Sequence, residues 1–277
     1  MKRHAVSRLD RHASGALRMV GRYGDLDPAE YSRFKHGDGA ASERYGELLA
    51  THAVRHLPLQ GLSRLVVTSS GFDVAPPASH SLTAPFVDAL QARLGSAVQI
   101  DSVKVQRTRP SNGDYATMDT AARMLAIGGT LDAGSAADAL AGATVVALDD
   151  IVVTGLHEHT MDEALCRAGA SVIHHLYVVD AHTFRHVPDV ESELNRYDVH
   201  TVDDLLTLVG GTTFVPNARV ARMLLGLPAA ELDVAVRALP SWVVTWLLEV
   251  ALCDPLADLP RYSAGADVVR ELVGQAA

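Results

Sequence analysis

The sequence is poor in cysteine, lysine and aromatic residues. Its two cysteines, Cys166 and Cys253, lie far apart and form no CxxC pair, which argues against a disulfide framework and a zinc knuckle. No apolar run reaches the roughly 18 residues of a membrane span. The basic N-terminus lacks the apolar region of a secretory signal and only weakly resembles an organelle transit peptide. We therefore expect a cytoplasmic protein with no membrane partner.

Positive charge is also scarce. The 24 Lys and Arg residues against 33 Asp and Glu give a net charge of 24 − 33 = −9, which argues against nucleic acid as a partner. Only three of the basic residues are lysines: Lys2, Lys35 and Lys104. Hydrophobic residues make up 48% of the chain, which excludes disorder throughout, and 277 residues allow one or two domains.

Strand and helix patterns alternate between residues 42 and 182. The strand-like runs are 62–68, 98–105, 144–148 and 172–179, and the helical patterns are 42–57, 82–94, 119–127, 135–140 and 158–168. This alternation predicts an α/β core with a parallel, Rossmann-like sheet. Residues 183–277 contain five helical segments separated by Gly or Pro and predict an all-α C-terminal module. Residues 1–30 show no clear periodicity, so we expect an N-terminal arm over residues 1–41.

One segment combines a buried strand with two acids and a turn. Residues 145–155 read V-V-A-L-D-D-I-V-V-T-G. In an open parallel sheet, ligands bind at the carboxyl ends of strands, and two adjacent carboxylates there suit a ribose diol, directly or through Mg²⁺. The Thr-Gly turn that opens a helix offers backbone N–H groups and a positive dipole end to a phosphate. The alternative is a strand end with two capping acids and a chance Thr-Gly.

This order of elements resembles the signature of the type I phosphoribosyltransferases. The resemblance implies an α/β phosphoribosyltransferase core that uses 5-phosphoribosyl pyrophosphate and Mg²⁺. It assigns the ribose hydroxyls or the metal to Asp149 and Asp150. It assigns the 5′-phosphate to the loop formed by Thr154, Gly155, Leu156 and His157.

The sequence departs from that family pattern at two places. Many members continue the Thr-Gly with Gly or Lys and then Thr, whereas this chain continues with Leu156 and His157. The hypoxanthine-guanine branch has an acid just before the Thr, where it assists the purine, but Val153 stands there. Purine salvage by that route is therefore in doubt.

A narrower resemblance is to the phosphoribosyltransferase-like proteins encoded with bacterial tellurium-resistance and stress gene clusters. It rests on D-D-I-V-V-T-G-L-H-E at residues 149–158 and on Y-S-R-F-K-H-G at residues 31–37. Asp114-Tyr115 and the helical portion from Asn217 onward also match. The resemblance covers about residues 29–270 and implies an acceptor from a specialised-metabolite or stress pathway.

The resemblance also implies roles for two further segments. In the resembling fold, the loop after the first core strand contacts pyrophosphate, which points to Ser69, Ser70 and Gly71. A basic loop then closes over the pyrophosphate, which points to Lys104, Arg107 and, more weakly, Arg109, with Arg107 as the catalytic cation. An ordinary polar loop and a solvated basic face are the alternatives.

The acceptor site is expected from the N-terminal segment. Orotate-type relatives use an aromatic residue and a Lys around the acceptor, so Phe34 and Lys35 are the candidates, with Tyr31 and Arg33 beside them. A core Phe next to a surface Lys is the alternative. A zinc site at His157, Glu158, His159 and Asp162 is disfavoured, because His157 and His159 point in different directions at a helix start.

Together these observations predict Mg²⁺-dependent transfer of 5-phosphoribose to a small-molecule acceptor, with release of pyrophosphate. Asp149, Asp150 and Arg107 are the expected catalytic residues. The same pocket could run the reaction in reverse, on a nucleotide or nucleoside. A protein that senses a nucleotide without catalysis is the third reading. Because homo-oligomers are common in the resembling fold, a homodimer is one expected assembly.

Overall fold

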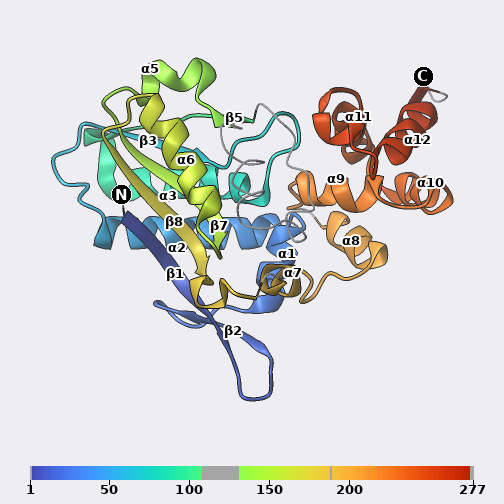
Figure 1. Cartoon of the computed structure of the whole chain (residues 1–277), viewed down its shortest axis with the longest axis horizontal. Coiled ribbons are helices and arrows are strands. Elements are labelled where there is room, and N and C mark those ends of the chain that lie inside the picture. Colours follow the sequence, from blue (N-terminus) through green and yellow to red (C-terminus); the bar gives the residue numbers. More distant parts are fainter. Residues whose placement is uncertain (1, 108–130, 188, 212, 275–277) are drawn as a thin grey trace.

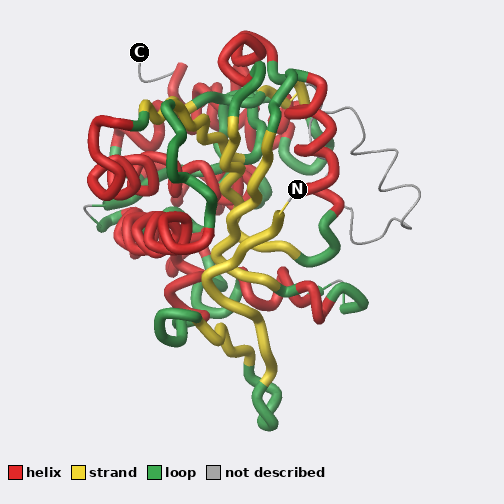
Figure 2. Tube along the Cα trace, turned by 90° about the vertical axis from the view of Figure 1, so that its left-hand side faces the viewer, coloured by secondary structure: helices red, strands yellow, loops and turns green. Residues whose placement is uncertain are grey.

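The structure, a computed structural model, describes residues 2–107, 131–187, 189–211 and 213–274 (Figures 1 and 2). The strands are β1 (Lys2–Arg11), β2 (Leu17–Gly21), β3 (Arg64–Ser69), β4 (Gln99–Ser102), β5 (Gln106–Arg107), β6 (Leu131–Asp132), β7 (Thr144–Val152) and β8 (Val172–Asp180). The helices are α1 (Pro28–Lys35), α2 (Gly39–His56), α3 (Thr83–Leu94), α5 (Ala137–Leu140), α6 (Leu156–Arg167), α7 (Val190–Asn195), α8 (Val202–Val209), α9 (Ala218–Leu225), α10 (Ala229–Ala238), α11 (Ser241–Cys253) and α12 (Ser263–Gly274). The predicted helix over 119–127 lies outside the described residues.

The centre of the molecule is a six-stranded sheet in the order β2-β1-β8-β7-β3-β4. Strands β1, β8, β7, β3 and β4 run parallel, and β2 pairs antiparallel with β1. The parallel strands are joined through helices, as the alternation in the sequence predicts. The prediction of an α/β fold with a mostly parallel sheet and a helical C-terminal region is confirmed.

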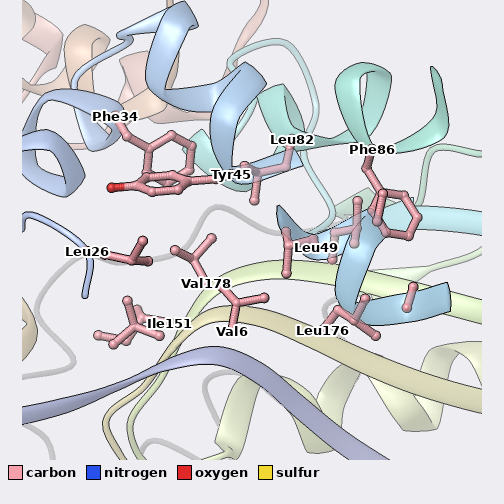
Figure 3. Packing of buried hydrophobic residues seen from close by; sticks show 14 of the residues in the cluster. Val6, Leu26, Phe34, Tyr45, Leu49, Leu82, Phe86, Ile151, Leu176 and Val178 are labelled. Atoms are coloured by element: carbon pink, nitrogen blue, oxygen red, sulfur yellow. The ribbon is translucent and has the colours of Figure 1, made fainter. Parts of the chain in front are cut away.

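Helices cover both faces of the sheet. Figure 3 shows one side of this core, where Phe34 and Tyr45 lie above Val178 and Leu49 near Leu176. This cluster joins α1, α2 and α3 to the sheet. On the other face, α5 and α6 bury a second cluster against β3, β7 and β8. Burial on both faces explains why the parallel strands are nearly continuous apolar runs rather than alternating ones.

The N-terminal residues are part of the sheet. Strand β1 pairs with β8 on one side and with β2 on the other, and the β1–β2 hairpin extends at the bottom of Figure 1. Residues 2–21, within the N-terminal arm predicted over residues 1–41, thus form a hairpin of the central sheet despite their lack of clear periodicity. The buried hydrophobic residues Val6 and Leu9 of β1 lie three positions apart. This spacing breaks the two-residue alternation typical of strands, so the sequence pattern did not indicate a strand here.

The C-terminal helices α8 to α12 have a hydrophobic cluster of their own. Figure 1 shows them gathered beside the sheet rather than over its faces. Ala75, from the loop after β3, joins this cluster and ties the helices to the edge of the core. Among the described residues, no helix combines the length and the apolar character needed to cross a bilayer.

Strand β7 is longer than the sequence predicted. It continues past Leu148 through Asp149 and Asp150 to Val152, because β8 offers backbone partners as far as Asp180. Ile151 and Val152 are buried, so the two acids lie inside the strand, near its carboxyl end. The acids are therefore held by the sheet and not by a flexible loop.

Candidate functional site

The two consecutive acids of β7 form one wall of a cavity of about 360 Å³. Asp150 is 6% exposed, and its carboxylate forms a salt bridge with the Lys35 ammonium group at the end of α1. Asp149 accepts a hydrogen bond from Ser70 Oγ at 3.3 Å and one from the backbone N of Asp150 at 2.9 Å. Both carboxylates are thus fixed by partners from three different segments.

The environment of Asp149 strongly favours its protonated form. Burial is the largest cause, and the neighbouring charge of Asp150 adds to it, so that the pKa of Asp149 rises to about 8 although Lys35 opposes the shift. A ligand or metal ion that brings positive charge or hydrogen-bond donors to the diacid would lower this pKa. The site is therefore prepared for a cation or for a diol that donates hydrogen bonds.

The loop after β3 lies next to the diacid. Ser70 Oγ is 2.7 Å from His157 Nε2, and Ser69 Oγ is 3.0 Å from His80 Nδ1. Gly71 packs closely against Leu131: a Cβ atom at this position would lie only 2.7 Å from the Leu131 side chain, so a larger residue would require a shift. Ser70 and Gly71 line the cavity, whereas Ser69 faces His80 outside its lining.

The turn after β7 has the conformation of an anion-binding loop. Gly155 has φ of +81°, a left-handed conformation that favours glycine. Thr154 is exposed, and its Oγ1 accepts a 3.4 Å contact from the backbone N of Leu156, where α6 begins. The first N–H groups of a helix have no partners within the helix, so this turn can bind a phosphate oxygen.

His157 connects this turn to the cavity. Burial lowers the pKa of its imidazole well below the usual range, and the positive charge of Arg107 adds to the effect. The ring is therefore neutral near pH 7 and contributes hydrogen bonds rather than charge. Among the described residues, no group of three or more His, Cys, Asp or Glu side chains is arranged to hold a metal ion, including around His157 and His159.

The predicted basic residues separate in space. Arg107 lines the cavity, and its Nε donates to Gly71 O at 3.1 Å. Lys104 lies outside the lining: it donates to Asp73 O at 2.6 Å and lies 4.2 Å from the centre of the Phe72 ring. The structure therefore does not bring Lys104 into the site, because this backbone carbonyl and ring hold it on the outside of the loop. Arg109 and the Asp114-Tyr115 pair lie outside the described residues.

The structure places the predicted acceptor residues in different surroundings. Lys35 lines the cavity, but Phe34 and Tyr31 have no exposed surface. Phe34 packs edge-on against Tyr45, with ring centres 5.4 Å apart, so the proposal that it stacks on an acceptor is wrong. The Phe34 ring lies in the hydrophobic cluster shown in Figure 3, where burial of its apolar surface stabilises the fold.

The two other residues of that segment serve the core and the surface. Tyr31 is buried beside Phe34, and burial raises the pKa of its hydroxyl. Arg33 donates to Asp198 at 2.9 Å and lies 3.6 Å from Asp38, outside the cavity lining. The structure thus places neither side chain against the cavity.

Four charged residues that line the cavity were not predicted from the sequence. Glu191 from α7 and Arg219 and Arg222 from α9 line it, together with Asp254 after α11. Asn217 caps α9 by accepting a hydrogen bond from the backbone N of Arg219 at 3.0 Å. An Asn at this position indicates where the helix begins, but it does not indicate that the helix points toward the cavity. These residues are far from the diacid in sequence, and only the fold brings them together.

A divalent cation such as Mg²⁺ prefers oxygen ligands, keeps several waters and usually takes one or two protein carboxylates together with substrate phosphates. The site offers Asp149 and Asp150 as such carboxylates. With two acids and no third ligand among the described residues, the donor set fits an ion that arrives with a phosphorylated ligand.

Comparison with known proteins gives one family match. A family model described as "PRTase ComF-like" matches residues 21–265. No curated protein matches the chain. Solved structures with detectable similarity include a hypoxanthine-guanine phosphoribosyltransferase from Bacillus anthracis (12% identity, TM-score 0.32, 52% of this chain and 69% of that one). Another is the hypoxanthine phosphoribosyl transferase of Trypanosoma cruzi (14% identity, TM-score 0.37, 55% and 71%). The glutamine phosphoribosylpyrophosphate amidotransferase of B. subtilis is also similar (18% identity, TM-score 0.39, 71% and 44%).

Proposed function

The chain belongs to the ComF-like phosphoribosyltransferase family, and from this premise we propose that it transfers 5-phosphoribose from 5-phosphoribosyl pyrophosphate to a small-molecule acceptor. The bond from ribose C1 to the pyrophosphate oxygen breaks, a bond from C1 to the acceptor nucleophile forms, and pyrophosphate leaves. The observation that carries the proposal is the diacid of β7, which lines a cavity together with His157, two residues after the glycine turn that opens α6.

The diacid would bind the ribose. Asp149 and Asp150 are held rigidly by the sheet and can accept hydrogen bonds from two neighbouring hydroxyls. Mg²⁺, when bound, would neutralise the charge that develops on the leaving pyrophosphate. The two carboxylates would hold that ion directly or through its waters, while the donor's own oxygens supply the remaining ligands.

The phosphate groups would bind at two places. The backbone N–H groups from Thr154 to His157, at the start of α6, suit the 5′-phosphate. Ser70, Gly71 and the Arg107 guanidinium suit the pyrophosphate, because they offer hydroxyl, backbone and cationic donors on the same side of the cavity. The two proposed phosphate sites adjoin, because Ser70 Oγ lies 2.7 Å from His157 Nε2.

The acceptor would enter from the C-terminal helices. Arg219 and Arg222 of α9 and the segment that follows α11 line the cavity together with the diacid. We therefore propose that residues 183–277 select the acceptor and that residues 42–182 bind the donor. Val153 stands where the hypoxanthine-guanine branch has a purine-assisting acid, so an acceptor from a specialised-metabolite or stress pathway is favoured over a salvage base. A cytoplasmic location is also proposed, since both cysteines are unpaired.

A non-catalytic donor sensor is the second candidate. It is favoured by the Lys35–Asp150 salt bridge, which occupies one carboxylate of the diacid. A donor that binds there must share Asp150 with the ammonium group or displace it, and either change would alter the surroundings of Lys35 at the end of α1. A sensor could use that change to signal donor binding without turnover.

Donor binding can be measured by isothermal titration with Mg²⁺ present. We expect Asp150→Asn to weaken binding about 10- to 100-fold, because a hydrogen bond to a charged group contributes about 1.5–3 kcal/mol. Thr154→Val, in the turn that opens α6, should also weaken binding, and the matched control Thr183→Val, an equally exposed threonine away from that turn, should not. Donor binding that is equal in all four proteins would reject the proposed site.

Turnover separates the candidate functions once binding is established. Release of pyrophosphate in the presence of candidate acceptors supports transfer. Formation of 5-phosphoribosyl pyrophosphate from a nucleotide and pyrophosphate would indicate the reverse reaction. Tight donor binding with neither reaction, together with a changed environment of Lys35, would favour the sensor.

A further inference from the structure

A second cavity, of about 560 Å³, lies along the start of β1 and shares no lining residue with the diacid cavity. Strand β2 pairs with β1 only from Ser7 onward, where Ser7 faces Gly21. The edge of β1 before Ser7 is therefore uncovered on that side. Residues from β1, from the end of β2, from α2 and from the end of β8 surround this opening.

The lining of this second cavity is cationic, although the whole chain carries a net charge of −9. Arg3, Arg8 and Arg22 line it, and Asp180 is the one carboxylate in the lining. Arg3 is neutralised by a salt bridge with Glu158 at 2.8 Å. The side chain of Arg22 makes no hydrogen bond or salt bridge with the described residues. A guanidinium group in this state is available to bind an anion.

Four histidines gather at the same place. His4 lies 5.7 Å from His52 and 5.9 Å from His174 between ring centres, and His52 lies 4.3 Å from His56. His4 Nε2 and both ring nitrogens of His174 are buried without a hydrogen-bond partner. Buried polar atoms are paired in the great majority of cases. His174 does not line the cavity, but His4 does, so its orphaned Nε2 points to a ligand or water that completes it.

We propose that this cavity binds a phosphate-type oxyanion, either free or as the end of a phosphomonoester, between Arg22 and the imidazoles of His4 and His52. The volume falls in the range of small-molecule sites and leaves room for an organic group attached to the phosphate. Because Arg3 pairs with Glu158 and Arg8 lies 3.7 Å from Asp10, Arg22 is the lining arginine whose positive charge is available to attract an anion. The described histidines form no group arranged to hold a metal ion.

Binding at this cavity should be linked to proton uptake. Burial, assisted by neighbouring positive charges, lowers the pKa of His4 and brings the pKa of both His52 and His174 to about 4. Besides Arg3 and Arg8, the titratable and charged groups around these imidazoles are Lys2, Arg22, Tyr23, His56, His175 and Asp180, and Arg55 lies over the Tyr23 ring. An oxyanion within about 4–6 Å would raise these pKa values by about one to three units, so that it binds more tightly as the pH falls.

The test is a titration of the full-length protein with inorganic phosphate at about pH 6, followed by NMR of the histidine side chains. We expect phosphate to shift the His4 and His52 resonances and to raise their apparent pKa by about one unit or more. Arg22→Ala should weaken phosphate binding about tenfold or more, because it removes a charged donor. The matched control Arg18→Ala, whose guanidinium pairs with Asp25 on the same hairpin, should leave it unchanged.

Two further variants separate this cavity from the proposed donor site. Thr154→Val should leave the His4 and His52 shifts unchanged, and His52→Gln should weaken phosphate binding as Arg22→Ala does. The proposal is overturned if millimolar phosphate leaves these imidazoles unshifted, if it shifts only His157, or if zinc and not phosphate binds them. A phosphorylated compound that shifts them more strongly than free phosphate identifies the phosphomonoester as the ligand.

Discussion

Replacing Lys35 with methionine removes one partner of a buried salt bridge and keeps most of the side chain's length. The side chains of Lys35 and Asp150 are each 9% exposed, and Asp149 is the next residue along β7. Removal of the ammonium group therefore leaves the buried Asp150 carboxylate without its nearest cation. Breaking a buried pair in this way costs about 3–5 kcal/mol of unfolding free energy. At about 2–4 °C per kcal/mol for a chain of this size, the melting temperature should fall by at least about 6 °C.

The assay is urea unfolding at pH 7, with the matched control Arg33→Met. Arg33 is the neighbour on α1 that pairs with Asp198, and these side chains are 36% and 41% exposed, so its loss should cost about 0–1 kcal/mol. In the double variant Lys35→Met with Asp150→Asn, part of the stability should return, because no buried charge is left alone. Equal, small losses for Lys35→Met and Arg33→Met, with no recovery in the double variant, would refute this account of the pair.

Three other variants test separate parts of the structure. Phe34→Ala should lower the unfolding free energy by about 3–5 kcal/mol in urea, and a loss below about 1 kcal/mol would contradict its place in the core. Gly155→Ala should cost about 1–2 kcal/mol, because the residue has a left-handed φ and its Cβ would lie 2.9 Å from Arg3; an unchanged midpoint would show that the turn relaxes. The pKa of both His52 and His174 is lowered to about 4 by burial. Their contribution to stability is complete above about pH 6.5 and is lost as the pH falls toward 4. His52→Gln should therefore flatten the acid side of the stability profile by up to about 1.4 kcal/mol per pH unit, and an unaltered profile would contradict the lowered pKa.

The part of the site that could be predicted is local in sequence. The apolar run of β7, its two acids and the Thr-Gly turn lie within a few residues of one another, so their order alone indicated a strand, a ligand-binding edge and a helix start. The exposed Thr154 and the left-handed Gly155 occupy that turn in the structure. Whether these residues bind a donor stays a prediction.

The rest depends on tertiary packing, which local patterns do not carry. Arg219 reaches the cavity because α9 folds back beside the sheet, and nothing in its neighbours' spacing indicates that direction. Phe34 and Lys35 are adjacent in α1, but the helix turns one into the core and the other toward Asp150. Strand β1 was not predicted because most of its residues are polar and its buried residues are few. Its place in the sheet comes from pairing with β8.

Crystals soaked with 5-phosphoribosyl pyrophosphate and Mg²⁺ test the central claim most directly. The account predicts electron density for the donor in the cavity of about 360 Å³, with the ribose hydroxyls or the metal ion at Asp149 and Asp150. The 5′-phosphate should lie at the backbone N–H groups that follow Thr154. Density that places the donor elsewhere, or a donor held there with no contact from either carboxylate to ribose or metal, would contradict it.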